Sequence, residues 1–127
     1  MVMLFIGILA PFVEEIIFRG LIYQTFKTHY SMTTTIFLQA SIFAVIHINP
    51  LQILYTFILA LLFVWLVISL NSLWASILMH MSFNLTTIIV LRIIKENESV
   101  FQFSLLVVFA IILFSIGLGT RMISKYK

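Results

Sequence analysis

Three ionisable residues stand close together in the apolar stretch APFVEEIIFRGLIY: Glu14, Glu15 and Arg19. Glu15 and Arg19 are four residues apart, so a helix places them on one face within reach of each other. Glu14 projects about 100° away from Glu15 on the same helix. Arg19 can therefore hold one carboxylate as an ion pair, while the other stays free to take a proton from water as a general base.

Two histidines and an asparagine extend this set. His47 ends the stretch FAVIH, and the stretch HMSFN places His80 and Asn84 four residues apart, again on one helical face. An ionisable side chain at the centre of a bilayer costs about 2.5–3.5 kcal/mol on insertion scales, so such groups have buried partners or a function. For the two glutamates and the arginine, a purely structural ion cluster is the alternative.

The composition indicates a membrane protein. Of 127 residues, 63% are hydrophobic and 9% are charged, and the mean hydropathy is +1.23. A soluble domain of this length needs more charge on its surface. The absence of cysteine excludes disulfides, thiolate metal sites and a cysteine nucleophile. No polar surface rich in basic residues is present, so we expect a lipid bilayer and not nucleic acid as the partner.

Apolar segments of roughly 20 residues are long enough to cross a bilayer as helices. The sequence predicts an all-α, polytopic bundle of about five such spans, with the polar set inside the membrane. The expected spans are Val2–Phe26, Thr34–His47, Leu51–Leu70, Leu73–Ile94 and Phe101–Leu118. Pro50 is expected to end helical structure at Asn49, and Asn71 and Ser72 to form a tight turn. One membrane domain, residues 1–127, follows.

Basic residues in the loops set the expected orientation. The side with the first loop and the C-terminus carries four Lys or Arg, and the opposite side carries two. The two groups are Lys27, Arg121, Lys125 and Lys127, against Arg92 and Lys95. We therefore expect a multi-pass protein of the cell membrane, with a cytoplasmic C-terminus.

The stretches EEIIFR, FAVIH and HMSFN together resemble the three motifs of the CAAX protease and bacteriocin-processing (ABI) family of intramembrane proteases. Those motifs are Glu-Glu-x-x-x-Arg, Phe-x-x-x-His and His-x-x-x-Asn, in this order on successive membrane helices. The resemblance covers about residues 10–85. Family members generally carry further helices before the first motif, so we expect this chain to be short at its N-terminus.

The resemblance implies a role for each matching residue. It makes Glu14 the glutamate that activates a water, His47 the histidine beside it, and His80 with Asn84 the pair that holds the oxyanion. The supporting residues that it implies are Glu15, Arg19 and Phe43. An intramembrane endopeptidase acting on membrane-proximal or lipidated peptides is the function expected.

A metal version of this chemistry is the alternative mechanism. Glu14, His47 and His80 offer the carboxylate and imidazole ligands that suit Zn²⁺, with water in an open fourth position. The chain lacks the His-Glu-x-x-His motif of soluble zinc proteases. We therefore prefer a glutamate-activated water to bound zinc.

The substrate is not specified by the sequence. The resemblance implies bacteriocin processing, self-immunity or CAAX-type protein maturation. One rival function is a non-catalytic membrane immunity protein that binds a partner and uses the polar cluster only structurally. Another is a small transporter that relays protons or ions, although the matched halves of an inverted repeat are not visible.

Overall fold

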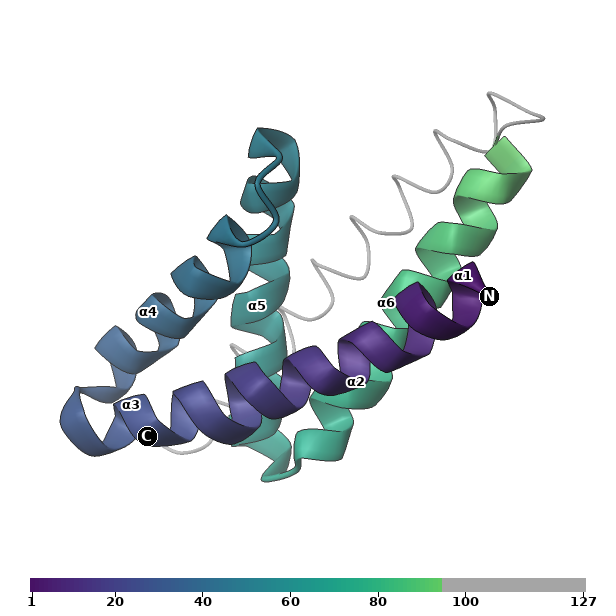
Figure 1. The fold of residues 1–127 in the computed structure, drawn as a ribbon. Coiled ribbons are helices and arrows are strands. Elements are labelled where there is room, and N and C mark those ends of the chain that lie inside the picture. The colour runs from purple at the N-terminus through teal and green to yellow at the C-terminus, as the bar shows by residue number, and fades with distance from the viewer. Residues whose placement is uncertain (95–127) are drawn as a thin grey trace.

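Residues 1–94 are described by a computed structural model, and all regular elements in that part of the chain are helices (Figure 1). The elements are, in order, α1 (Val2–Leu4), η1 (Phe5–Leu9), α2 (Ala10–Glu15), η2 (Ile16–Ile22), α3 (Tyr23–His29), α4 (Met32–Val45), α5 (Pro50–Leu70) and α6 (Leu73–Ile94). The expected all-α class is confirmed for these residues. The predicted fifth span, Phe101–Leu118, lies outside them.

The first five elements follow one another without a break, and we call the run Val2–His29 the first helix. Two stretches of it, η1 and η2, are π-helical. In η1 the N–H of Ala10 bonds to the carbonyl of Phe5, five residues back, and the same pattern recurs where η2 ends. Such widened turns are found mostly at functional sites. Here they flank α2, the segment that carries both glutamates.

Capping side chains set the turn between α4 and α5. The side chain of Asn49 accepts hydrogen bonds from the backbone N–H groups of Leu51 and Gln52, at 3.0 and 3.3 Å. Asn49 itself is extended, with φ −72° and ψ 125°, and Pro50 opens α5. Proline disfavours helix at the residue before it and suits the first helical position. The interruption expected at Pro50 is confirmed.

The turn between α5 and α6 forms where the sequence predicts it. Asn71 adopts the left-handed conformation, with φ 46° and ψ 40°, and ends α5. Asparagine tolerates this conformation better than most residues because its short amide bonds locally. Since α6 begins at Leu73, α5 and α6 become antiparallel neighbours.

Among residues 1–94, two helices are long and apolar enough to cross a membrane, Pro50–Leu70 and Leu73–Ile93. α4 is apolar but has 14 residues, about 21 Å of helix against a hydrocarbon core of about 30 Å. A full crossing by α4 or by the first helix, and with it the count of five spans, stays a prediction. In Figure 1, α4 runs beside α5, while the N-terminal half of the first helix runs beside α6.

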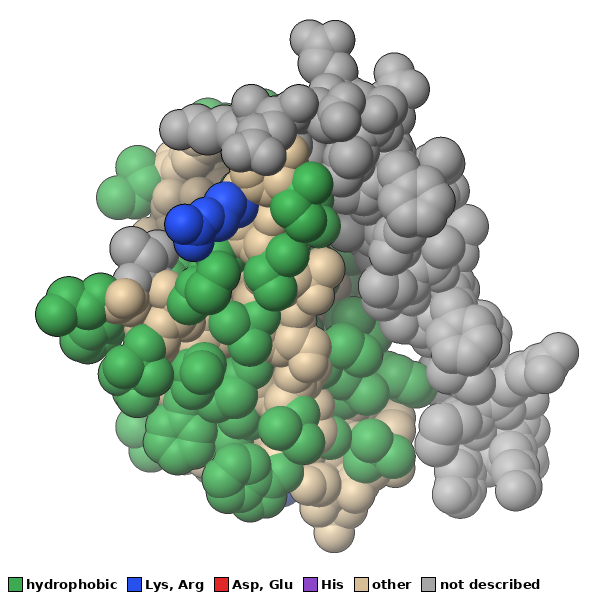
Figure 2. Space-filling model, turned by 90° about the vertical axis from the view of Figure 1, so that its right-hand side faces the viewer, with side chains coloured by type: hydrophobic (Ala, Val, Ile, Leu, Met, Phe, Trp, Pro, Cys, Tyr) green, Lys and Arg blue, Asp and Glu red, His purple; other side chains and the backbone are tan. Residues whose placement is uncertain are grey.

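Several polar side chains are buried among the apolar residues of the core, and many large hydrophobic side chains are exposed. Glu15, Arg19 and Gln39 are completely buried, whereas Leu51 is 78% exposed. Figure 2 shows one face covered mostly by hydrophobic side chains, with little charge among them. Water would not stabilise such a surface, but lipid does, because the exposed side chains are as apolar as the acyl chains around them.

Candidate active site

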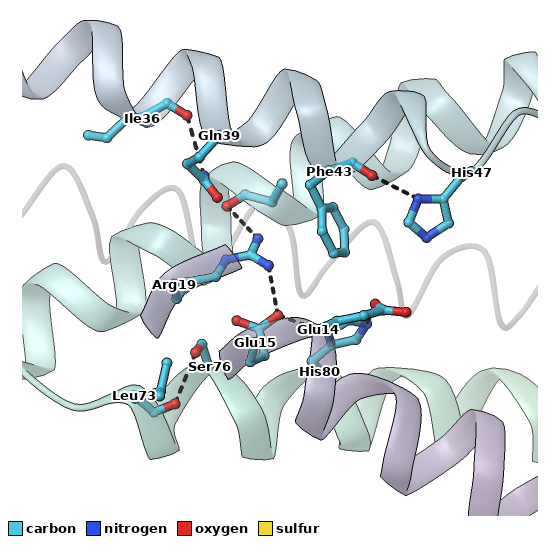
Figure 3. Close-up of polar contacts among 11 residues, drawn as sticks. Glu14, Glu15, Arg19, Ile36, Gln39, Phe43, His47, Leu73, Ser76 and His80 are labelled. Carbon is cyan, nitrogen blue, oxygen red and sulfur yellow. Dashed lines mark hydrogen bonds and ion pairs between the residues drawn. The ribbon is translucent and has the colours of Figure 1, made fainter. Parts of the chain in front are cut away.

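The Glu15–Arg19 pair expected from the spacing is present at the centre of the bundle (Figure 3). Arg19 Nη1 donates to Glu15 Oε1 at 2.9 Å, and both side chains are 0% exposed. Arg19 Nη2 donates to the backbone carbonyl of Ala60 on α5, at 3.2 Å. A buried charge is tolerable only when it is paired and hydrogen-bonded, and the guanidinium meets both conditions by joining the first helix to α5.

Two aromatic rings enclose the Arg19 guanidinium. Its central carbon lies 4.6 Å from the centroid of Phe43 and 5.3 Å from that of Phe63. Cations are attracted to the faces of aromatic rings, most strongly where water is excluded. Phe43, expected as the supporting aromatic, therefore lies against the supporting arginine.

His80 links the two adjacent glutamates. Its Nδ1 lies 2.8 Å from Glu15 Oε1, and its Nε2 lies 3.8 Å from Glu14 Oε2. Because a carboxylate paired with Arg19 can only accept hydrogen bonds, Nδ1 of His80 is the donor. The imidazole ring also stacks on Phe63, with centroids 4.7 Å apart and an interplanar angle of 25°. His80 is thus fixed in orientation, with Nε2 directed toward Glu14.

Glu14 differs from its neighbour, as the helical spacing predicts. The Glu14 side chain is 30% exposed, whereas Glu15 is completely buried between Arg19 and His80. A carboxylate can deprotonate a water only where water reaches it. Of the two glutamates, Glu14 is the one with exposed side-chain surface.

His47 lies in the turn after α4, two residues beyond the end of that helix. Its Nδ1 is 2.9 Å from the carbonyl oxygen of Phe43. A carbonyl only accepts, so Nδ1 carries a proton and a neutral His47 keeps Nε2 free as an acceptor. The Phe43 ring is 5.1 Å from the His47 ring and 5.9 Å from the His80 ring. In Figure 3, His47 and the Glu14 carboxylate lie on the same side of Phe43.

The backbone directly after His47 is strained. Ile48 has φ 63° and is 84% exposed. A positive φ is an outlier for a β-branched residue, and such outliers cluster at functional sites. The strained turn returns the chain to Pro50 within three residues of His47.

Asn84 bonds to the main chain of the first helix. It projects from the same face of α6 as His80, one turn further along, as expected. Its Nδ2 donates to the backbone carbonyl of Ile6 on the first helix, at 2.9 Å. The structure therefore brings the other six expected residues around the Phe43 ring and the Glu15–Arg19 pair, while the amide of Asn84 bonds to helix backbone.

The zinc alternative can be tested on the donor arrangement. Among residues 1–94, no group of three His, Asp or Glu side chains is close enough to hold one ion. Glu14 and His80 approach each other, and the Nδ1 bonds of His80 and His47 leave Nε2 of each ring available, but the three side chains do not form one such group. The expected ligand set Glu14, His47 and His80 does not fit a single tetrahedral ion in this arrangement, so no step is routed through a metal.

Two contributors to the site were missed by sequence reasoning. The carbonyl of Ala60 binds Arg19 but carries no sequence signal, because every residue has a carbonyl. Gln39 is completely buried on α4, and its amide nitrogen donates to the carbonyl of Ile36 (Figure 3). A signal for Gln39 was available, since it is a strongly polar residue in an apolar span, one helical turn before Phe43.

A comparison with protein families gives one match. The model of the type II CAAX prenyl endopeptidase Rce1-like family matches residues 1–86. That range contains all three motifs and each of the seven expected site residues. Searches of curated proteins and of solved structures returned no match.

Proposed function

The chain belongs to the type II CAAX prenyl endopeptidase Rce1-like family, and we propose that it is an intramembrane endopeptidase in which Glu14 activates the attacking water. Its substrates are membrane-proximal or lipidated peptides, in CAAX-type maturation, bacteriocin processing or self-immunity. The single observation that carries the mechanism is the unequal environment of the two glutamates. Glu15 is buried and held by Arg19 and His80, while Glu14 is partly exposed and faces His80 Nε2.

The nucleophile is a water molecule between Glu14 and the histidines. A direct hydrogen bond does not span the 3.8 Å between Glu14 Oε2 and His80 Nε2, but one water can contact both atoms. His47, with its Nε2 free, is the second residue that orients this water.

The reaction then needs one proton to move from water to the leaving group. Glu14 takes the proton as the water oxygen bonds to the scissile carbonyl carbon. The tetrahedral oxyanion is stabilised by nearby donors, of which a protonated His80 Nε2 is the one adjacent to Glu14. The carbon–nitrogen bond breaks, and the proton passes from Glu14 to the departing amine, which leaves Glu14 ready for another cycle.

Arg19 and Glu15 support this step through His80. The Arg19-paired carboxylate holds Nδ1 of His80, so Nε2 is the only ring nitrogen directed to the reacting atoms. Preorganised groups of this kind stabilise a transition state without having to reorient during the reaction.

A Glu14→Gln variant tests the proposal. The amide has the same shape but cannot accept the proton, so we expect kcat on a prenylated or membrane-anchored reporter peptide to fall by about 10²–10⁴-fold, with KM nearly unchanged. Ser82→Ala is the matched control, since Ser82 is exposed on α6 and bonds only to its own helix. Both variants are assayed in membranes, with and without a chelator.

Three results would contradict the proposal. Cleavage by Glu14→Gln at the parent rate would remove Glu14 from the chemistry. Loss of activity of the parent with the chelator would make the reaction metal-dependent. A folded parent that cleaves none of the reporters, while the Glu14→Gln variant retains an immunity phenotype, would favour the partner-binding immunity protein.

A further inference from the structure

Pro11 leaves one backbone carbonyl of the first helix without a donor from its own helix. In η1 the N–H of Ala10 bonds to the Phe5 carbonyl, five residues back, so it does not serve the carbonyl of Ile6. In the π-helical pattern, the N–H that would bond to the Ile6 carbonyl is that of residue 11. Proline has none, so neither the α-helical nor the π-helical pattern supplies a partner for Ile6.

Asn84 provides the missing donor from another helix. Its Nδ2 lies 2.9 Å from the Ile6 carbonyl oxygen, across 78 positions of sequence. In hydrocarbon no water is present to bond a free carbonyl, and prolines in membrane helices are tolerated where side chains of neighbouring helices satisfy the freed groups. Asn84 and Ile6 fit that description.

The side chains of α6 pack closely against the first helix at the same level. A Cβ atom built on Gly7, the residue after Ile6, would lie 2.5 Å from Cδ2 of Leu85, the residue after Asn84. Small residues permit such close approach between membrane helices. The Asn84 amide can reach a main-chain carbonyl here because Gly7 leaves room for α6.

We propose that Asn84 is a positioning residue: its amide bonds to the Ile6 carbonyl that Pro11 leaves free, and so fixes the register of α6 on the first helix. His80 is one turn before Asn84, and Glu14 is one turn beyond Pro11. The Asn84–Ile6 bond therefore fixes the position of the His80 ring relative to the Glu14 carboxylate. The role in activity rests on the proposed function, whereas the role in helix register does not.

A double-mutant cycle of Asn84→Ala and Pro11→Ala tests this inference. Alanine at position 11 restores an N–H, so the first helix can bond the Ile6 carbonyl itself. The Asn84 amide then becomes dispensable. We expect Asn84→Ala to lower kcat by on the order of 10²-fold in the parent, the effect of a small misplacement of reacting groups, with little change in KM. In the Pro11→Ala background the same substitution should change kcat only slightly.

Helix register is measured without reference to activity. The chain contains no cysteine, so paired spin labels can be placed at Leu4→Cys and Ile89→Cys, both exposed positions on the first helix and α6. We expect Asn84→Ala to broaden or shift the distance distribution in the parent and not in Pro11→Ala. The melting temperature in detergent should fall by about 5 °C in the parent background only, and Ser82→Ala should change neither quantity.

The outcomes separate the two roles of Asn84. An equal loss of kcat in both backgrounds, with distances unchanged, would overturn the inference and make Asn84 a donor to the oxyanion. If neither the parent nor any variant cleaves a peptide, the proposed function fails. The distances between the spin labels still show whether Asn84 fixes the register of α6 on the first helix. If Pro11→Ala does not fold, the Asn84→Leu variant tests the inference instead. Leucine is similar in size to asparagine and is tolerated in lipid, so it should disturb the protein only if the amide is needed. An unchanged label distance and an unchanged melting temperature would overturn the inference.

Discussion

At the residue scale, the two adjacent glutamates have different partners and therefore different uses. Glu15 is bonded to Arg19 and His80 and completely buried, whereas Glu14 is partly exposed and faces His80. One helical step of about 100° separates the two environments. A pair of identical side chains can thus supply one structural anion and one base.

Arg19 is expected to be the least replaceable of the buried residues. Lysine keeps the charge but cannot donate to Glu15 and the Ala60 carbonyl with the same planar group, or lie flat against Phe43. We expect Arg19→Lys to lower the free energy of unfolding by about 1–3 kcal/mol, and Arg19→Met, which leaves Glu15 unpaired, by about 3–5 kcal/mol. Thermal unfolding in detergent measures both, with Ser82→Ala as the control.

If Arg19→Met unfolds at the parent temperature, the Glu15–Arg19 pair contributes no stability, and its role would be confined to orienting His80. The activity of the same variant then separates the two roles, because a misdirected His80 lowers kcat even in a stable protein.

At the element scale, α2, which carries both glutamates, lies between the two π-helical segments of the first helix. The close contact of the first helix with α6 depends on Gly7, where a Cβ would lie 2.5 and 3.1 Å from two atoms of Leu85. The other glycine of this helix, Gly20, has more room: a Cβ there would lie 3.6 Å from Leu73. Packing against α6 therefore requires glycine at position 7, whereas position 20 has room for a Cβ atom.

This contrast gives a matched pair of substitutions. Gly20→Ala should be neutral or stabilise by up to about 1 kcal/mol, because alanine favours helix. Gly7→Ala gains the same propensity but overpacks against Leu85, and we expect a net destabilisation of about 1–3 kcal/mol. Adding Leu85→Ala should relieve the overpacking. Melting temperatures of the four variants check this, and equal effects of the two glycine substitutions would show that the helices do not touch closely at Gly7.

At the scale of the whole molecule, the described part of the bundle buries Glu15 and Arg19 among apolar core residues and exposes many large hydrophobic side chains. The antiparallel course of the helices places the α3–α4 turn and the α5–α6 turn at one end of the bundle, and the α4–α5 turn at the other (Figure 1). The count of basic residues predicts that the first of these ends is cytoplasmic.

Cysteine labelling in intact cells tests this orientation, and the absence of native cysteine gives it a clean background. An impermeant thiol reagent should label Ile48→Cys, in the α4–α5 turn, and should label Thr28→Cys, near the end of α3, only after the cells are opened. The reverse pattern would invert the predicted topology. Labelling of both sites from outside would mean that α4 does not separate the two compartments.

The sequence alone predicted the helices of residues 1–94 and gave the candidate site residues. Apolar runs, Pro50 and Asn71 place the helix boundaries because these signals act locally, through chain geometry and hydrogen-bond capping. Spacing by three or four residues also predicted the Glu15–Arg19 pair, since both partners lie on one helix. Polar residues in lipid are costly, so their mere presence marked the site.

Only the tertiary structure decided which groups from different helices meet. Neither the Ala60 carbonyl bound to Arg19 nor the Ile6 carbonyl bound to Asn84 can be read from residue types, because the partner is main chain. His80 contacts Glu15 across 65 positions, a distance over which local spacing carries no information. Such contacts depend on how the helices cross, and packing over the whole bundle sets those crossings.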